Sequence, residues 1–192
     1  RAFMTFIAHN SPALVLAPME GVTDSPMRSL LTARGGFDYC VSEFYRVSQD
    51  VPAPKAFYSH VPELRHGAKT SSGVPVQVQL LGGNAVKVGL AAVNAHRAGA
   101  TSIDLNFGCP APLVNKSDGG ACLLKEPKRI FEIISTVRSM VAKEIPVSAK
   151  LRLGWENPEE IYRNAIEVEH AGASWITIHA RTKTQGYRPP AY

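Results

Sequence analysis

The chain has 192 residues, 45% of them hydrophobic and 19% charged, which is the composition of a soluble globular protein with one sizeable core. No apolar run approaches the roughly 20 residues that a membrane-spanning helix needs, so we expect no membrane segment. The net charge of +5 is mild and includes no long basic run, so it permits an RNA partner without requiring one.

Strand and helix signals alternate from Ala13 to the end of the chain, whereas residues 1–12 read as an N-terminal extension. The opening residues are too short for a signal-peptide core, which argues against export. Six short and nearly continuous apolar runs predict parallel strands that are buried on both faces. The predicted strands are 14–18, 39–44, 76–81, 102–107, 147–153 and 175–179.

Capping residues predict the helices between these strands. Asp24 begins one, with Pro26 in its first turn, that ends near Gly35. Asn84 begins another that ends at Gly99, and a third covers 127–142. For the fourth we expect Asn157 as the cap, Pro158 at the first position, and Glu159 and Glu160 in the first turn.

Two segments of the chain resemble each other, and together they indicate the fold class. Residues 96–105 and 170–178 both pass from a helix end through a glycine into a strand. Repeated βα units are typical of a TIM barrel or of an open doubly wound sheet. The first βα turn, 18–24, lacks the glycine-rich dinucleotide pattern. We therefore predict an α/β fold, a TIM (β/α)8 barrel of which this chain supplies about six units.

One connection, 45–73, is unusually long and contains three prolines and a short helical patch near 55–60. Loops of that length between strands are usually functional. We expect this one to shape the mouth of a substrate site.

Cysteine and histidine spacing limits the possible chemistry. Cys40, Cys109 and Cys122 form an odd set without a C-x-x-C pair, which argues against a disulfide framework and favours the cytoplasm. The six histidines show no zinc spacing, so we predict no metal site. A single cysteine is more often a small buried hydrophobe than a catalytic group.

Polar residues gather at the carboxyl ends of the predicted strands, where a barrel keeps its active site. They are Glu20, Glu43, Arg46, Gln77, Gln79, Asn106, Cys109, Lys150, Arg152, His179 and Arg181. Lys150 and Arg152 share one face of their strand and repel each other unless an anion or an electron-rich ring lies between them. Alternatively, one of them reaches solvent or pairs with Asp104 or Glu43. Buried polar groups in such number favour a flat heteroaromatic ligand.

Five motifs in sequence order resemble those of the tRNA-dihydrouridine synthases. The central one is NFGCP at 106–110, followed by VNKSDGGACLL at 114–124. The others are LAPMEGVTD (16–24), VQLLG (78–82), SAKLRLG (148–154) and HARTKTQGY (179–187). The segment SEFYRV (42–47) is most similar to the bacterial C-type subgroup.

This resemblance implies FMN-dependent reduction of a uridine in the D-loop of tRNA to 5,6-dihydrouridine, with NADPH as the reductant. Hydride then passes from the flavin to carbon 6 of uracil, and Cys109 donates the proton to carbon 5. By the same resemblance, Asn106 and Arg152 lie beside the uracil. The positions implied for the cofactor are Pro18, Met19, Glu20, Gln79, Lys150 and His179.

The resemblance covers the front part of the family's length. We expect residues 13–192 to be the N-terminal part of the FMN-binding barrel, with strands seven and eight and the helical RNA-binding domain absent. Two other readings remain open. One is an FMN barrel that reduces a free small pyrimidine, and the other is a catalytically incomplete fragment that binds RNA.

Overall fold

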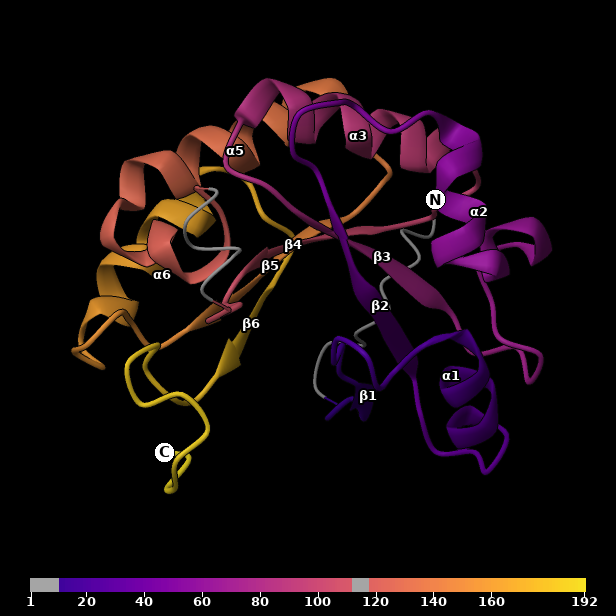
Figure 1. The fold of residues 1–192 in the computed structure, drawn as a ribbon, viewed down its shortest axis with the longest axis horizontal. Coiled ribbons are helices and arrows are strands. Elements are labelled where there is room, and N and C mark those ends of the chain that lie inside the picture. Colours follow the sequence, from indigo (N-terminus) through magenta and orange to yellow (C-terminus); the bar gives the residue numbers. More distant parts are fainter. Residues whose placement is uncertain (1–10, 112–117) are drawn as a thin grey trace.

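The computed structural model describes residues 11–111 and 118–192, so most of the expected N-terminal extension lies outside the described residues (Figure 1). Within them, six strands form one parallel sheet in the order β1 to β6. The strands are β1 (Val15–Leu16), β2 (Tyr39–Arg46), β3 (Val76–Leu81), β4 (Ile103–Phe107), β5 (Val147–Arg152) and β6 (Ile176–His179).

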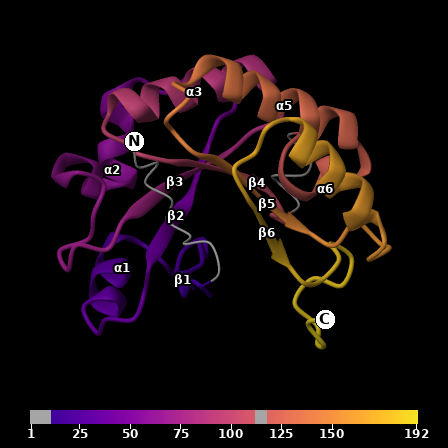
Figure 2. The ribbon, with the colours of Figure 1, turned by 180° about the vertical axis from the view of Figure 1, so that it is seen from behind.

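Helices alternate with these strands. They are α1 (Ser25–Thr32), α2 (Phe57–His60), α3 (Ala85–Arg97), α5 (Pro127–Met140) and α6 (Glu160–His170), with short 3₁₀ helices η1 (Pro54–Ala56), η2 (Pro62–His66) and η3 (Gly120–Lys125). Figures 1 and 2 show α3, α5 and α6 side by side along one outer face of the curled sheet. Their apolar sides and the strands form the core, in which Leu80, Ile103 and Ile134 are completely buried.

The strand order confirms the predicted fold class. A doubly wound sheet reverses its strand order at a switch point, whereas a barrel adds each strand beside the previous one. Here every strand pairs with its neighbour in sequence, and the sheet curls into part of a TIM barrel. All six predicted strands are present, although β1 is shorter than the predicted 14–18 and β2 extends to Arg46. The central strands are largely apolar because both of their faces are covered.

Three of the four predicted helix starts are confirmed, including Pro127 as the first residue of α5, and one is wrong. Asp24 accepts a hydrogen bond from the Met27 N–H at 2.9 Å, and Asn84 caps α3 in the same way. Asn157 is not the cap of α6, which begins at Glu160. The Asn157 side chain instead accepts from the Glu159 N–H at 3.0 Å, so residues 157–160 form a turn before the helix.

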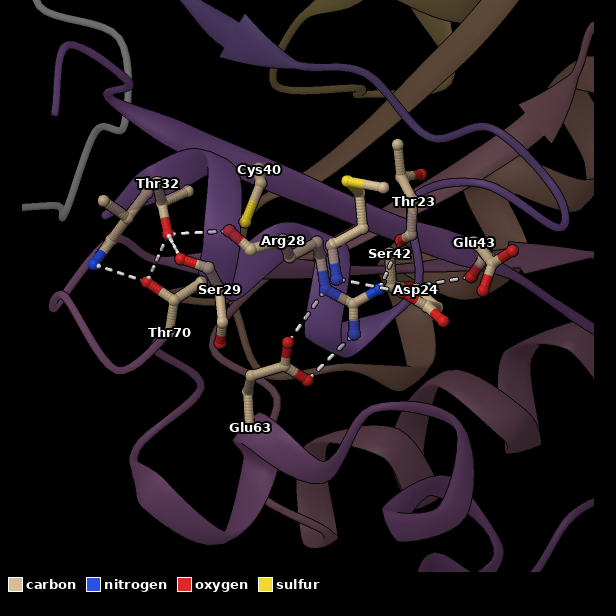
Figure 3. A network of polar contacts seen from close by, with 12 residues as sticks. Thr23, Asp24, Arg28, Ser29, Thr32, Cys40, Ser42, Glu43, Glu63 and Thr70 are labelled. Atoms are coloured by element: carbon tan, nitrogen blue, oxygen red, sulfur yellow. Dashed lines mark hydrogen bonds and ion pairs between the residues drawn. The ribbon is translucent and has the colours of Figure 1, made fainter. Parts of the chain in front are cut away.

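The long connection between β2 and β3 is folded back onto the body of the protein. Phe57, Val61 and Leu64 are buried in the core. The Glu63 carboxylate in η2 accepts hydrogen bonds from Nε and Nη2 of Arg28 in α1, each at 2.9 Å (Figure 3). The connection therefore fastens α1 to the sheet. Across the described ranges, no helix is both long and apolar enough to cross a membrane.

Candidate active site

Most of the polar residues at the strand ends line one cavity of about 520 Å³, whereas Glu43, Arg46 and Gln77 do not. All nine residues that were assigned a role from the family resemblance line it: Pro18, Met19, Glu20, Gln79, Asn106, Cys109, Lys150, Arg152 and His179. They come from the loop after β1 and from β3, β4, β5 and β6, so the curl of the sheet brings them together. The long connection 45–73 contributes none of the lining residues, so its expected part in shaping the mouth stays a prediction.

Asn106 holds the loop that carries Cys109. Its side-chain oxygen accepts hydrogen bonds from the backbone N–H groups of Gly108 at 3.0 Å and Cys109 at 2.9 Å. Two bonds to one oxygen fix the turn at the end of β4. The Cys109 thiol is thereby held at the cavity rather than packed inside the sheet.

Burial raises the pKa of the Cys109 thiol above its usual value, and the Glu20 carboxylate adds to the rise. The charges of Arg152 and Arg46 and a backbone hydrogen bond from Ala111 act in the opposite direction. Because the net shift is upward, the thiol keeps its proton at neutral pH. It is thus suited to donate a proton and poorly suited to act as a thiolate nucleophile.

Lys150 faces the cavity without a hydrogen-bonding partner for its ammonium group among the described residues. The ion pair with Asp104 or Glu43 that the sequence left open is not formed there. Burial lowers the pKa of Lys150, the Asp104 charge acts in the opposite direction, and the neighbouring charge of Arg152 lowers the pKa further. An anionic or acceptor-rich group in the cavity would relieve both effects.

Arg152 is only 1% exposed and holds the loops around the cavity. Its Nε donates to the carbonyl of Gly108 at 2.9 Å, and its Nη1 donates to Thr182 at 3.0 Å and to Gly186 at 2.7 Å. The ring of Tyr187 lies 5.3 Å from the guanidinium carbon. Arg152 therefore joins the loop after β4 to the segment after β6.

His179 is uncharged at neutral pH. Burial, together with the charges of Arg152, Lys150 and Arg181, lowers its pKa to about 4. Nη1 of Arg181 lies 3.2 Å from His179 Nε2. A guanidinium only donates, so Nε2 is the acceptor and the imidazole proton is on Nδ1.

Two carboxylates lie at the opposite side of the site. Burial raises the pKa of Glu20, and the nearby Glu43 carboxylate raises it further. Glu43 in turn accepts a hydrogen bond from the N–H of Gly21. The loop after β1, which lines the cavity, is thus anchored to β2.

Further residues line the cavity without having been assigned a role from the sequence, among them Phe44, Arg181 and Tyr187. Arg181 follows His179 by two residues, so its position at a strand end was the available signal. Tyr187 lies in an irregular segment that Arg152 draws back toward the sheet, and no local pattern predicts that contact.

Comparisons with known proteins agree on one family. The family model described as Dihydrouridine synthase (Dus) matches residues 15–192. A tRNA-dihydrouridine(16) synthase from Neisseria meningitidis serogroup B is 50% identical over 179 residues, which is 93% of this chain and 54% of the relative. Proteins of the same name from Vibrio vulnificus (50%, covering 91% and 55%) and Pseudomonas syringae pv. tomato (49%, covering 93% and 56%) are equally similar.

The chain therefore spans just over half the length of these curated relatives. Among solved structures, a phosphonopyruvate hydrolase matches with a TM-score of 0.57 and 19% identity, covering 91% of this chain and 60% of that one. At that identity the match speaks for the fold alone.

Proposed function

The chain belongs to the dihydrouridine synthase family, and from that premise we propose that the whole protein reduces a uridine of tRNA to 5,6-dihydrouridine. Position 16, which the names of the relatives give, is the proposed target within the D-loop. The protein would act in the cytoplasm, where tRNA and NADPH are both available.

The observation that carries the proposal is the Cys109 thiol at the donor-rich cavity. Reduction of the uracil 5,6 double bond adds a hydride at carbon 6 and a proton at carbon 5. A thiol whose pKa is raised by burial still holds a proton at neutral pH, so Cys109 supplies the proton at carbon 5. Asn106 and Arg152 are the proposed uracil contacts beside it.

The residues present fit FMN as the cofactor. Lys150 has no hydrogen-bonding partner for its ammonium group in the described ranges, and the buried Nε of Arg181 has no acceptor there either. Such unpaired donors are costly unless a ligand with acceptor atoms meets them. Reduced FMN supplies the hydride when bound, and NADPH is the proposed source of its electrons.

The proposed cofactor-binding residues lie on both sides of the cavity. Pro18, Met19 and Glu20 offer the backbone of the loop after β1. From the opposite side, Gln79, Lys150 and the uncharged His179 offer side-chain donors. Lys150 places a positive charge where negative charge collects on a reduced heteroaromatic ring, which stabilises that charge electrostatically.

Substrate access follows from the chemistry of RNA. A uracil must leave its stack to enter a cavity, and a base in a tRNA loop does so at lower cost than one in a duplex. The net charge of +5 is compatible with a polyanionic partner.

The test uses full-length protein, NADPH and a tRNA transcript without modified bases. We expect the purified protein to be yellow, to release FMN on denaturation, and to add two hydrogen atoms to one uridine, located by nuclease digestion and mass spectrometry. Cys109→Ala serves as the matched control. Reduction of free uridine or uracil in preference to tRNA would favour a small-pyrimidine reductase instead. Binding of tRNA without bound flavin or turnover would favour a non-catalytic RNA-binding protein.

A further inference from the structure

A buried carboxylate lies inside the sheet behind the cavity. Asp104 in β4 is 2% exposed, and both of its oxygens accept hydrogen bonds. The Ser148 hydroxyl of β5 donates to Oδ1 at 2.5 Å, and the Gln79 amide of β3 donates to Oδ2 at 2.7 Å. Ser148 in turn accepts from the Gln77 amide at 3.0 Å, which leaves its own proton for Asp104.

The row of hydrogen bonds continues from Asp104 to the Cys109 loop. The Gln79 side-chain oxygen accepts from the Asn106 amide nitrogen at 2.8 Å. The Asn106 oxygen accepts from the N–H groups of Gly108 and Cys109 at 3.0 and 2.9 Å. Three strands and the loop after β4 are therefore linked by one unbroken row.

Both ends of this row impose the same direction on the two amides between them. A carboxylate with donors on both oxygens requires the Gln79 nitrogen, and backbone N–H groups can only donate and so require the Asn106 oxygen. If either amide were rotated by 180°, two acceptors or two donors would face each other in a buried place, and the groups left unpaired would destabilise that arrangement.

We propose that Asp104 is a positioning residue, which fixes the orientation of the Gln79 and Asn106 amides and through them the loop that carries Cys109. The proposal deepens the proposed function, on which its meaning for catalysis rests. Each of the two amide nitrogens keeps a second hydrogen with no acceptor among the described residues. Gln79 and Asn106 therefore present N–H donors to the cavity, and the site selects a ligand edge rich in carbonyl oxygens.

Burial raises the pKa of Asp104 above its usual value, while the hydrogen bonds from Ser148 and Gln79, the charge of Lys150 and a backbone hydrogen bond from Leu105 act in the opposite direction. At the other end of the row the direction does not depend on this balance, because the backbone N–H groups of Gly108 and Cys109 can only donate and so require the Asn106 oxygen.

The test measures Cys109 directly and needs neither flavin chemistry nor RNA. In full-length protein, the rate of alkylation by iodoacetamide is followed against pH, and modified cysteines are identified by mass spectrometry. Asp104→Asn keeps the shape of the side chain but presents either an oxygen or a nitrogen to Gln79, so it no longer requires the Gln79 amide nitrogen to face it. We expect the Cys109 loop to loosen, so that its thiol becomes more exposed and is alkylated about tenfold faster, with its pH midpoint moved down toward the usual thiol value of about 8.5. Cys122, whose Sγ contacts the Gly119 carbonyl at 3.1 Å, is the internal reference.

A second variant separates the orientation of the amides from charge and packing. In Asp104→Asn with Gln79→Glu, position 104 carries the amide and position 79 carries the carboxylate. The carboxylate at 79 can then accept hydrogen bonds from the amides at both 104 and 106. Asn106 then keeps its native orientation, and we expect the Cys109 alkylation rate to return to within about twofold of the parent. Ser148→Ala is the matched control, because it removes the other hydrogen bond of Asp104 and leaves the direction of the row intact.

An unchanged Cys109 profile in Asp104→Asn would overturn the inference. So would a folded double variant that stays as reactive as Asp104→Asn, or a Ser148→Ala protein that reproduces the Asp104→Asn change. If the double variant does not fold, the comparison of Asp104→Asn with Ser148→Ala decides. A parent protein that fails to reduce uridine would overturn the proposed function and leave this comparison intact.

Discussion

Among single residues, burial moves the ionisable groups of the site toward their uncharged forms. It raises the pKa of Cys109 and Glu20, and it lowers the pKa of Lys150 and of His179, the last to about 4. A cavity of this kind holds a proton on its acid and keeps its imidazole neutral. Both properties suit proton donation to a substrate at neutral pH.

Replacing Cys109 by Ala is expected to lower the rate of uridine reduction by roughly 10²–10⁴-fold, the usual loss when a general acid is removed. Flavin reduction by NADPH should be unaffected, because the thiol donates only in the second half of the reaction. Single-turnover kinetics on the full-length protein separate the two steps. Cys40→Ala and Cys122→Ala are the controls, and a Cys109→Ala protein as active as the parent would exclude the assignment.

His179 makes stability depend on pH in a defined direction. Its pKa is about 4 in the folded protein against 6.5 for an unperturbed histidine, so between these values the unfolded chain binds a proton that the folded protein does not. The free energy of unfolding therefore falls as pH decreases from 6.5 toward 4. In His179→Gln this contribution disappears. Urea unfolding of parent and variant from pH 4 to pH 8 measures it, and parallel curves for the two proteins would contradict it.

Among the structural elements, the contacts that position the cavity are made outside it. The Arg28–Glu63 pair joins α1 to η2, with the two side chains 0% and 5% exposed. Arg28 Nη1 also donates to the Thr23 carbonyl at 2.8 Å (Figure 3). The Thr23 hydroxyl in turn accepts from the Met19 N–H at 2.8 Å. One ion pair thus supports the loop that offers Pro18, Met19 and Glu20 to the cavity.

Removing one partner of this pair should be costly. Arg28→Met leaves the Glu63 carboxylate buried and alone, and we expect the free energy of unfolding to drop by about 3–5 kcal/mol. Replacing both residues by Met should restore much of the loss, because no unpaired charge then remains. Urea denaturation measures both. Lys128→Met is the control: its pair with Glu167 has an 86% exposed lysine side chain, and its loss should change stability by less than about 1 kcal/mol.

The sequence predicted elements better than it predicted the contacts between them. Val76–Leu81 was predicted with its observed bounds, although Gln77 and Gln79 interrupt its apolar residues and are buried with them. The cap of α6 was misplaced because the Asn157 side chain bonds within its own turn, and a sequence does not say which N–H an asparagine will meet. The long connection is held against α1 by the hydrogen bond between Arg28 and Glu63, which are 35 positions apart. No local sequence pattern predicts a contact over that separation.

For the molecule as a whole, strand-end reasoning placed nine residues at one cavity because a barrel brings the carboxyl ends of its strands together. The same reasoning considered Asp104 only as a possible ion-pair partner of Lys150 or Arg152. Its role arises from hydrogen bonds to two neighbouring strands, which depend on register. The register sets Asp104 opposite both Gln79 and Ser148.

The curl of the sheet also leaves two of its strands at edges. Within the described ranges, β1 pairs only with β2 and β6 only with β5. Beside β6 lies an apolar hollow of about 420 Å³, lined by Tyr162, Ile166 and Trp175 among others. Tyr162 and Ile166 are 66% and 51% exposed, and Ile178 in β6 is 45% exposed. Exposed apolar surface next to an unpaired strand edge favours association with another chain.

We therefore predict that residues 1–192, expressed alone, self-associate or unfold without a sharp transition, and bind FMN weakly. Each Å² of apolar surface left uncovered forgoes about 25 cal/mol of burial, and unpaired backbone groups at the β6 edge are free to recruit a second chain. Sedimentation velocity and thermal unfolding, with and without FMN, measure this against the full-length protein. Ile166→Lys tests the cause, because a charge in the apolar hollow beside β6, outside the cavity, should reduce self-association without repairing flavin binding. A monodisperse monomer that melts cooperatively and binds FMN tightly would refute the prediction.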